Sequence, residues 1–254
     1  MINVVLIGSG KVAYHLHKAM LGASGVALKQ IIARSSQALL DFEASVPTAD
    51  LNGTIQEADV YLLAVSDRAI AEVARQLPKQ DALYVHTSGA TDMEALGVHQ
   101  RKGVLYPLQT FSKERPVDFH SVPLILEAGC DKDLSLLEDL SNALSNNVLK
   151  LTPAQRKQLH LAAVFANNFT NHMVALGEEI CLNQGVQKEL LRPLLRETWA
   201  KLETLSAAQA QTGPARRGDR RTLEAHLRWL NDPEKEELYK LISHSIANTY
   251  DQEL

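Results

Sequence analysis

Hydrophobic and polar positions divide the chain into two parts with different periodicities. Up to residue 151, short continuous apolar runs alternate with segments in which apolar residues recur every three or four positions. The continuous apolar runs are typical of strands buried on both faces. The segments with apolar residues every three or four positions are typical of amphipathic helices. We expect strands near residues 2–7, 26–33, 46–50, 59–65, 82–86, 103–106, 122–127 and 148–151. This alternation predicts an α/β fold, a doubly wound and mostly parallel sheet with helices on both faces.

From residue 152 onward the pattern is helical. Thr152 and Pro153 are the residue types that favour an N-cap and a first helical position. We expect helices over residues 153–184 (with Gly185 at the end), 187–211, 219–230 and from 232 to near the C-terminus. The sequence therefore predicts an α/β domain at residues 1–152 and an all-α domain at 153–254.

Composition narrows the classes of protein that fit. A length of 254 residues, with 45% hydrophobic and 22% charged residues, suits a globular chain of two domains. A net charge of −4 gives no basic field for a nucleic acid. No signal peptide and no apolar stretch of about 18 residues is seen, so we expect a cytoplasmic protein without membrane contact. Cys130 and Cys181 have no metal-ligand spacing, and we expect buried thiols and no metal site.

A glycine-containing loop lies between the first expected strand and the first expected helix. In Gly8-Ser9-Gly10-Lys11-Val12-Ala13, Gly8 permits a tight turn, and Gly10 lets the backbone approach a pyrophosphate. Ala13 takes the third glycine's place, where the helix packs closely on the sheet. The helix that starts at Lys11 directs free N–H groups toward an anion. This motif in this context predicts a Rossmann-type dinucleotide-binding domain.

The end of the second strand bears on the choice between NAD and NADP. A domain that prefers NAD usually has Asp or Glu there to bind the ribose 2′-hydroxyl. This sequence has Arg34, Ser35 and Ser36 instead. Arg34 can pair with a 2′-phosphate, to which both hydroxyls can donate hydrogen bonds, so NADP is favoured. Alternatively, Arg34 is a solvated charge at a strand end.

Later strands supply the rest of the expected site, because parallel strands bring their carboxyl ends to one edge of the sheet. For the cofactor we expect contacts with Gly8, Ser9, Gly10, Lys11, Val12, Arg34, Ser35, Ser36, Ala64, Val65, Ser66, Asp67, His86, Thr87 and Ser88. For a substrate we expect contacts with Tyr106, Gln109 and Thr110.

The motifs at residues 8–13, 63–67, 86–89, 106–111 and 212–219 together resemble the Rossmann-like proteins with a C-terminal domain of unknown function, DUF2520. These proteins are commonly labelled predicted NADP oxidoreductases. The wider group is similar to pyrroline-5-carboxylate reductases, ketopantoate reductases and 3-hydroxyisobutyrate dehydrogenases. The resemblance implies an NADP cofactor and a helical domain that borders the substrate cleft and forms a homodimer. It does not supply a substrate.

Hydride transfer to a carbonyl or imine needs a proton donor near the reacting atom. In the hydroxyacid branch of the group, a Lys and an Asn one helical turn apart on the first long helix serve there. If Asn168 matches that Asn, the Lys position falls on Val164, which departs from the pattern. Asn168 and His172 share a helix face, and His160 lies near it, so His172 is the hypothetical proton donor. Alternatively, these side chains form hydrogen bonds between helices or across a dimer interface.

The loop from Thr212 to Asp219 is the other candidate for substrate binding. Its arginines, Arg216 above all, could hold a carboxylate or phosphate, and it lies where pyrroline-5-carboxylate reductases have a substrate loop. Alternatively, it is a solvated loop that ends in Asp219 as an N-cap. Two functions stay open: an NADP-dependent reductase of a small carboxylate-bearing keto or imine substrate, and a non-catalytic NADP-binding sensor or interaction protein.

Overall fold

The computed structural model describes residues 1–42 and 45–252, except for the side chain of Ser36. They form two compact units, which we call the sheet unit (residues 1–172) and the helical unit (residues 173–254). The border expected from sequence, at residue 152, falls where the first helix after the sheet begins. No helix within the described residues is long and apolar enough to cross a membrane.

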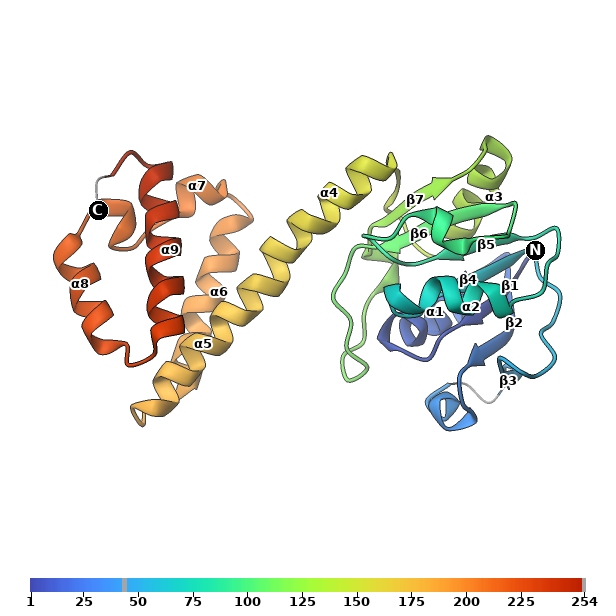
Figure 1. The fold of residues 1–254 in the computed structure, drawn as a ribbon, viewed down its shortest axis with the longest axis horizontal. Coiled ribbons are helices and arrows are strands. Elements are labelled where there is room, and N and C mark those ends of the chain that lie inside the picture. Colours follow the sequence, from blue (N-terminus) through green and yellow to red (C-terminus); the bar gives the residue numbers. More distant parts are fainter. Residues whose placement is uncertain (43–44, 253–254) are drawn as a thin grey trace. The chain divides into compact units, whose positions relative to one another are not determined.

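The described part of the sheet unit contains one eight-stranded sheet with the order β3-β2-β1-β4-β5-β6-β7-β8 (Figure 1). The antiparallel pair β6–β7 is joined to strands that otherwise run parallel. The strands are β1 Ile2–Ile7, β2 Val26–Ala33, β3 Thr48–Asp50, β4 Val60–Leu63, β5 Leu83–His86, β6 Lys102–Pro107, β7 Leu124–Ala128 and β8 Val148–Lys150. The expected α/β fold with a mostly parallel sheet is confirmed.

Both faces of the sheet are buried, which explains the continuous apolar runs. In β1, Val4 and Leu6 belong to the core on one face, and Val5 and Ile7 to the core on the other. Helices α1 Lys11–Gly22 and α3 Asp131–Asn142 pack on the first face, and α2 Ile70–Gln76 packs on the second. Short helical turns are η1 Ser36–Leu39, η2 Asp67–Ala69, η3 Met93–Leu96 and η4 Phe119–Ser121.

The long helix expected from residue 153 is present, with an irregular middle. It consists of α4 Pro153–Ala163, a π-helical segment η5 Val164–Phe169 and α5 Thr170–Asn183. A capping box fixes its start: Thr152 Oγ1 accepts from the Gln155 amide at 3.3 Å, and Gln155 Oε1 accepts from the Thr152 amide at 2.9 Å. The π-helical segment was not predicted, because periodicity does not distinguish it from an α-helix.

The helical unit continues with η6 Lys188–Leu190, α6 Leu191–Leu202, α7 Ala207–Ala210, η7 Ala215–Arg217, α8 Arg220–Trp229 and α9 Pro233–Thr249. The expectation of one helix over residues 187–211 was wrong. Ser206 and Gln209 form a capping box that starts a new helix there. Asp219 is the N-cap of α8, as expected, and Asp232 is the N-cap of α9, where a helix was expected to begin. They accept from the amides of Thr222 and Glu234 at 3.1 and 3.0 Å.

The two thiols do not have the expected environment. Cys130 is exposed, and Cys181 is partly exposed. Cys130 occupies the N-cap position of α3, and helix ends lie at the surface, so its place along the chain explains its exposure. Periodicity located the helix but gave no signal for the exposure of its cap.

Candidate functional site

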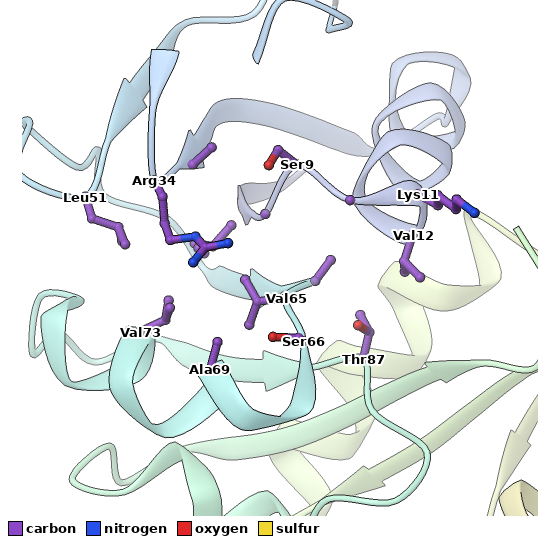
Figure 2. A pocket seen from close by; sticks show the side chains of 15 residues that line it. Ser9, Lys11, Val12, Arg34, Leu51, Val65, Ser66, Ala69, Val73 and Thr87 are labelled. Atoms are coloured by element: carbon purple, nitrogen blue, oxygen red, sulfur yellow. The ribbon is translucent and has the colours of Figure 1, made fainter. Parts of the chain in front are cut away.

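A cavity of about 430 Å³ lies at the carboxyl ends of β1, β2, β4 and β5 (Figure 2). This edge of a doubly wound sheet, where the strand order reverses, is where ligands bind. Its lining residues are Ile7, Gly8, Ser9, Gly10, Lys11, Val12, Ala33, Arg34, Leu51, Ala64, Val65, Ser66, Ala69, Val73 and Thr87. The cavity therefore brings together most of the residues expected to bind a dinucleotide.

The glycine loop has the backbone geometry that a dinucleotide site requires. Gly8 has φ of +135°, and a Cβ there would clash with the carbonyl oxygen of Ala64. Its amide donates to Ile32 O at 2.8 Å, which fixes the turn after β1. A Cβ at Gly8 would also lie 3.5 Å from that of Ala13, so the helix packs closely on this turn. The clash with the Ala64 carbonyl excludes a side chain at Gly8, and Ala13 is fully buried.

The N-terminus of α1 opens on the cavity without a side-chain cap. Gly10 is the N-cap residue, and none of the described side chains accepts a hydrogen bond at this end. A Cβ on Gly10 would meet no described atom within 4 Å, so the space beside it is open. The first-turn amides are thus available to an anion, which the helix dipole also favours. This cradle fits the pyrophosphate of a dinucleotide.

The side of the cavity after β2 combines a cation with apolar side chains. Figure 2 shows Arg34 reaching into the space that Leu51 and Val73 also face. Sequence reasoning missed Leu51, Ala69 and Val73 as lining residues. Ser35 is exposed and lies outside the cavity lining. Ser36 begins η1, and its side chain lies outside the described residues.

After β4, the residues Ala64, Val65 and Ser66 line the cavity, whereas Asp67 begins η2 and does not. After β5, Thr87 lines it, whereas its neighbours His86 and Ser88 are buried behind it. Ser88 Oγ accepts from the Ala90 and Thr91 amides at 3.2 and 3.0 Å. The structure therefore gives Ser88 a role in shaping the loop after β5.

His86 is completely buried and held as a neutral imidazole. Its Nδ1 accepts from the Ser88 amide at 3.2 Å, and its Nε2 lies 3.2 Å from the Asp92 carbonyl oxygen. An amide only donates and a carbonyl only accepts, so the proton belongs on Nε2. Burial lowers the pKa of His86 to about 4, and the Arg156 cation adds to the lowering. The ring therefore stays uncharged at neutral pH.

A buried arginine ties α4 to the loop after β5. Arg156 Nε donates to Glu127 Oε2 at 2.9 Å, and its Nη1 donates to the carbonyl oxygens of Ser88 and Gly89 at 3.2 and 2.8 Å. Both charged side chains are buried. Sequence reasoning missed this pair, because one charged residue in a strand or helix pattern looks like any other surface charge.

Tyr106, near the end of β6, pairs with His160 on α4. Tyr106 Oη lies 3.1 Å from His160 Nδ1. Burial raises the pKa of Tyr106 above its usual value. The other expected substrate contacts after β6, Gln109 and Thr110, are exposed, and the Thr110 amide donates to Gln109 Oε1 at 2.8 Å.

The structure does not bring the remaining candidates to the cavity lining. Asn168 lies on the π-helical segment η5 and His172 on α5, and both are exposed. Arg216 belongs to the helical unit, where its guanidinium lies 3.9 Å from the centroid of the Tyr250 ring. Their catalytic and substrate-binding roles stay predictions. Among the described residues, no group of three or more His, Cys, Asp or Glu side chains could hold a metal ion.

The sheet order, the glycine loop and the uncapped helix define a Rossmann-type protein with the pocket of a dinucleotide-binding domain. Residues 122–246 match the model of a domain of unknown function, DUF2520. This chain belongs to the DUF2520 family, as its sequence motifs suggested. No curated protein matches the sequence.

Several solved structures share this fold. A Bacteroides fragilis protein, provisionally named an NADP oxidoreductase, is 37% identical over 97% of this chain and 98% of its own, with a TM-score of 0.89. A Thermotoga maritima protein named without an activity is 21% identical over 98% of each chain, with a TM-score of 0.74. A pyrroline-5-carboxylate reductase from Coxiella burnetii is 19% identical over 100% of this chain and 99% of its own, with a TM-score of 0.57. At the identities of the last two, the likeness is one of fold.

Proposed function

We propose that this protein is an NADP-dependent oxidoreductase. The observation that carries the proposal is the cavity in which Gly8, Gly10 and the uncapped start of α1 meet the ends of β4 and β5. Its volume of about 430 Å³ is within the range of cofactor sites. The provisional name of the B. fragilis relative, which shares 37% of its residues with this chain, supports the reaction class.

The preference for NADP over NAD rests on Arg34. It follows β2 and lines the cavity on the side where such domains hold the adenosine ribose. A guanidinium there suits a 2′-phosphate by a charge-assisted hydrogen bond, whereas an acidic residue would suit the 2′-hydroxyl of NAD. When bound, the reduced cofactor would supply a hydride.

The substrate class that we propose is a small molecule with a carboxylate and a keto or imine group. The fold likeness to a pyrroline-5-carboxylate reductase supports this class. A carboxylate needs a cationic or N–H-rich partner, and Arg216 is our proposed one. Its guanidinium carbon lies 3.9 Å from the centroid of the Tyr250 ring, a cation–π contact that does not use up the N–H donors of the guanidinium.

We also propose a homodimer of cytoplasmic location. Helices α5 and α6 have no buried side chain among the described residues, although both carry large apolar residues. An apolar surface of this extent is typical of a subunit interface, and a second copy of the chain is the partner that we propose. The exposed thiol of Cys130 supports a reducing compartment.

Fluorescence titration with NADPH and NADH tests the cofactor, and NADPH oxidation over a panel of 2-keto acids and cyclic imino acids tests the reaction. We expect tighter binding of NADPH, which Arg34→Gln weakens at least tenfold while NADH binding changes little. Arg115→Gln is the matched control, since Arg115 is exposed and outside the cavity lining. Tighter binding of NADH would contradict the NADP assignment. Binding without oxidation of any panel member would indicate a non-catalytic NADP sensor instead.

A further inference from the structure

Tyr106 and His160 form a polar pair that the sequence did not single out as a unit. Their hydrogen-bonding atoms are 3.1 Å apart, and the rings meet edge to face with centroids 5.7 Å apart. Both side chains are only partly buried, so a ligand can reach them. A Cβ on Gly89 would lie 2.6 Å from His160 Nδ1 and 2.7 Å from Tyr106 Cζ. The pair therefore depends on a residue without a side chain after β5.

The topology of the sheet places this pair beyond the nicotinamide end of the cavity. Arg34 follows β2 and Thr87 follows β5, on opposite sides of the glycine loop after β1. The adenosine binds on the β2 side in such sheets, so the nicotinamide extends toward β5. Strand β6 lies next to β5 and parallel to it, and Tyr106 is near its carboxyl end. Gly89, where an added Cβ would clash with both rings, is two residues from Thr87, or within about 8 Å along the chain.

The charges around Tyr106 suit a group that holds a proton and can release it. Burial raises the pKa of the hydroxyl, and the Asp67 carboxylate adds to that, so the hydroxyl is protonated at neutral pH. The Arg156 cation acts in the opposite sense and favours the phenolate. Nη2 of Arg156 is buried without a hydrogen-bond partner among the described residues. Glu127 pairs with the same delocalised cation through Nε, so Nη2 keeps an unused hydrogen-bond donor.

We propose that Tyr106 is the proton donor of the reduction and that His160 returns the proton to it. This inference rests on the proposed function. As the hydride forms a C–H bond at the substrate carbon, the π electrons of the C=O or C=N group take the proton of Tyr106 Oη. The phenolate then takes the proton on Nδ1 of His160, while Nε2 of the same ring takes a proton from solvent. In sum, the substrate gains a hydride and a proton, and the reduced nicotinamide is oxidised.

A purely structural contact would only hold α4 against β6 and would take no part in proton transfer. Two substitutions in the pair and one control distinguish these roles. The substitutions are Tyr106→Phe and His160→Asn. The matched control is Tyr239→Phe in the helical unit, because Tyr239 Oη lies 2.8 Å from His226 Nδ1 in a pair of the same chemistry. If the contact is only structural, Tyr106→Phe and Tyr239→Phe lower the melting temperature alike, and neither changes kcat by more than about threefold.

The first readout needs no substrate. In protein labelled with ¹⁵N-histidine, we expect NADP⁺ to move the ring resonances of His160 and to leave those of His226 in place. Tyr106→Phe should shift the His160 Nδ1 resonance in the free protein, because its hydrogen-bond partner is gone. If saturating NADP⁺ leaves the His160 chemical shifts unchanged, the placement of the pair beside the nicotinamide is contradicted.

The second readout is turnover on the substrate that the panel identifies. We expect Tyr106→Phe to lower kcat at least about 100-fold, a typical loss for a missing general acid, with the Kd for NADPH within twofold of wild type. The alkaline limb of the kcat–pH profile should disappear in this variant, because the phenol whose deprotonation causes it is gone. The neighbouring His160 and the charged side chains of Asp67 and Arg156, which act on Tyr106, remain in place. His160→Asn should lower kcat less than Tyr106→Phe does, because the proton donor itself is still present.

The outcomes separate this inference from the function on which it rests. A wild-type protein that oxidises NADPH, with a Tyr106→Phe variant as active as wild type, would overturn the inference and leave the function standing. Loss of turnover in His172→Ala but not in Tyr106→Phe would assign the proton donor to His172. A wild-type protein that oxidises no NADPH on any panel member would contradict the function itself.

Discussion

Arg156 and Glu127 form an ion pair in which both side chains are buried, with Nε 2.9 Å from Oε2. Because Arg156 also donates to two carbonyl oxygens after β5, this one side chain connects β7, the first turn of α4 and the loop beside the cavity. The pair thereby positions both Gly89 and His160, which surround Tyr106. The geometry of the site depends on a contact that lies outside the cavity lining.

Removing one partner of this pair should destabilise the fold strongly. Arg156→Met leaves the Glu127 carboxylate buried without its cation and frees two buried carbonyl oxygens, so we expect a loss of about 3–5 kcal/mol in the free energy of unfolding. Urea denaturation measures it. Lys157→Met on the same helix is the control, since the Lys157–Asp92 pair is exposed and should change stability little. Equal losses of unfolding free energy in the two variants would show that the buried pair stabilises the fold no more than the exposed one.

Buried His86 should make stability depend on pH between about 4 and 6.5. The pKa is about 4 in the folded protein, below the ordinary value of 6.5 that applies when the chain is unfolded. Between these values only the unfolded state takes up the proton, so stability is complete above pH 6.5 and is lost as pH falls toward 4. The shift corresponds to roughly 3 kcal/mol. Urea denaturation at several pH values should show a shallower slope for His86→Gln, and an unchanged slope would contradict this origin.

Sequence patterns predicted the sheet well because its core is apolar on both faces. The run Ile2–Ile7 is a strand as expected, since its alternate side chains enter two separate cores. Patterns failed where local hydrogen bonds determine where a helix begins. At Ser206 a capping box starts a new helix and so divides the single helix that was expected. In the site, the spacing of Gly8 and Gly10 predicted the loop that would hold a pyrophosphate, and the position of Thr87 after a strand predicted that it lines the cavity. Nothing in a single sequence marks Arg156 and Glu127 as partners.

The two glycines of the cofactor loop should respond differently to the same substitution. Gly8→Ala places a methyl group against the Ala64 carbonyl at a φ of +135°, so we expect a lower melting temperature and no NADPH binding. Gly10→Ala meets no described atom within 4 Å, so the fold should survive. Its methyl group would occupy the space of the pyrophosphate, and the Kd for NADPH should rise at least tenfold.

Thermal melts and NADPH titrations of the same protein samples check this difference. Gly22→Ala is the control, because a Cβ at that position, the end of α1, also meets no described atom within 4 Å, and Gly22 is not part of the cavity lining. Wild-type affinity in Gly10→Ala would mean that the backbone there does not approach the cofactor. A stable Gly8→Ala variant would show that the turn after β1 can shift.

The apolar surface of the helical unit should hold two copies of the chain together. On α6, Leu194 is 63% exposed and Trp199 is 51% exposed, and hydrophobic side chains left so open gain free energy when a partner covers them. We expect a dimer at micromolar concentration, which sedimentation equilibrium measures, and a monomer for Leu194→Lys, because the ammonium group would be buried without a partner. Val98→Lys is the control: Val98 is 57% exposed but belongs to the sheet unit, and its variant should stay dimeric. A monomeric wild-type protein would refute the proposed interface, and a dimeric Leu194→Lys variant would place it elsewhere.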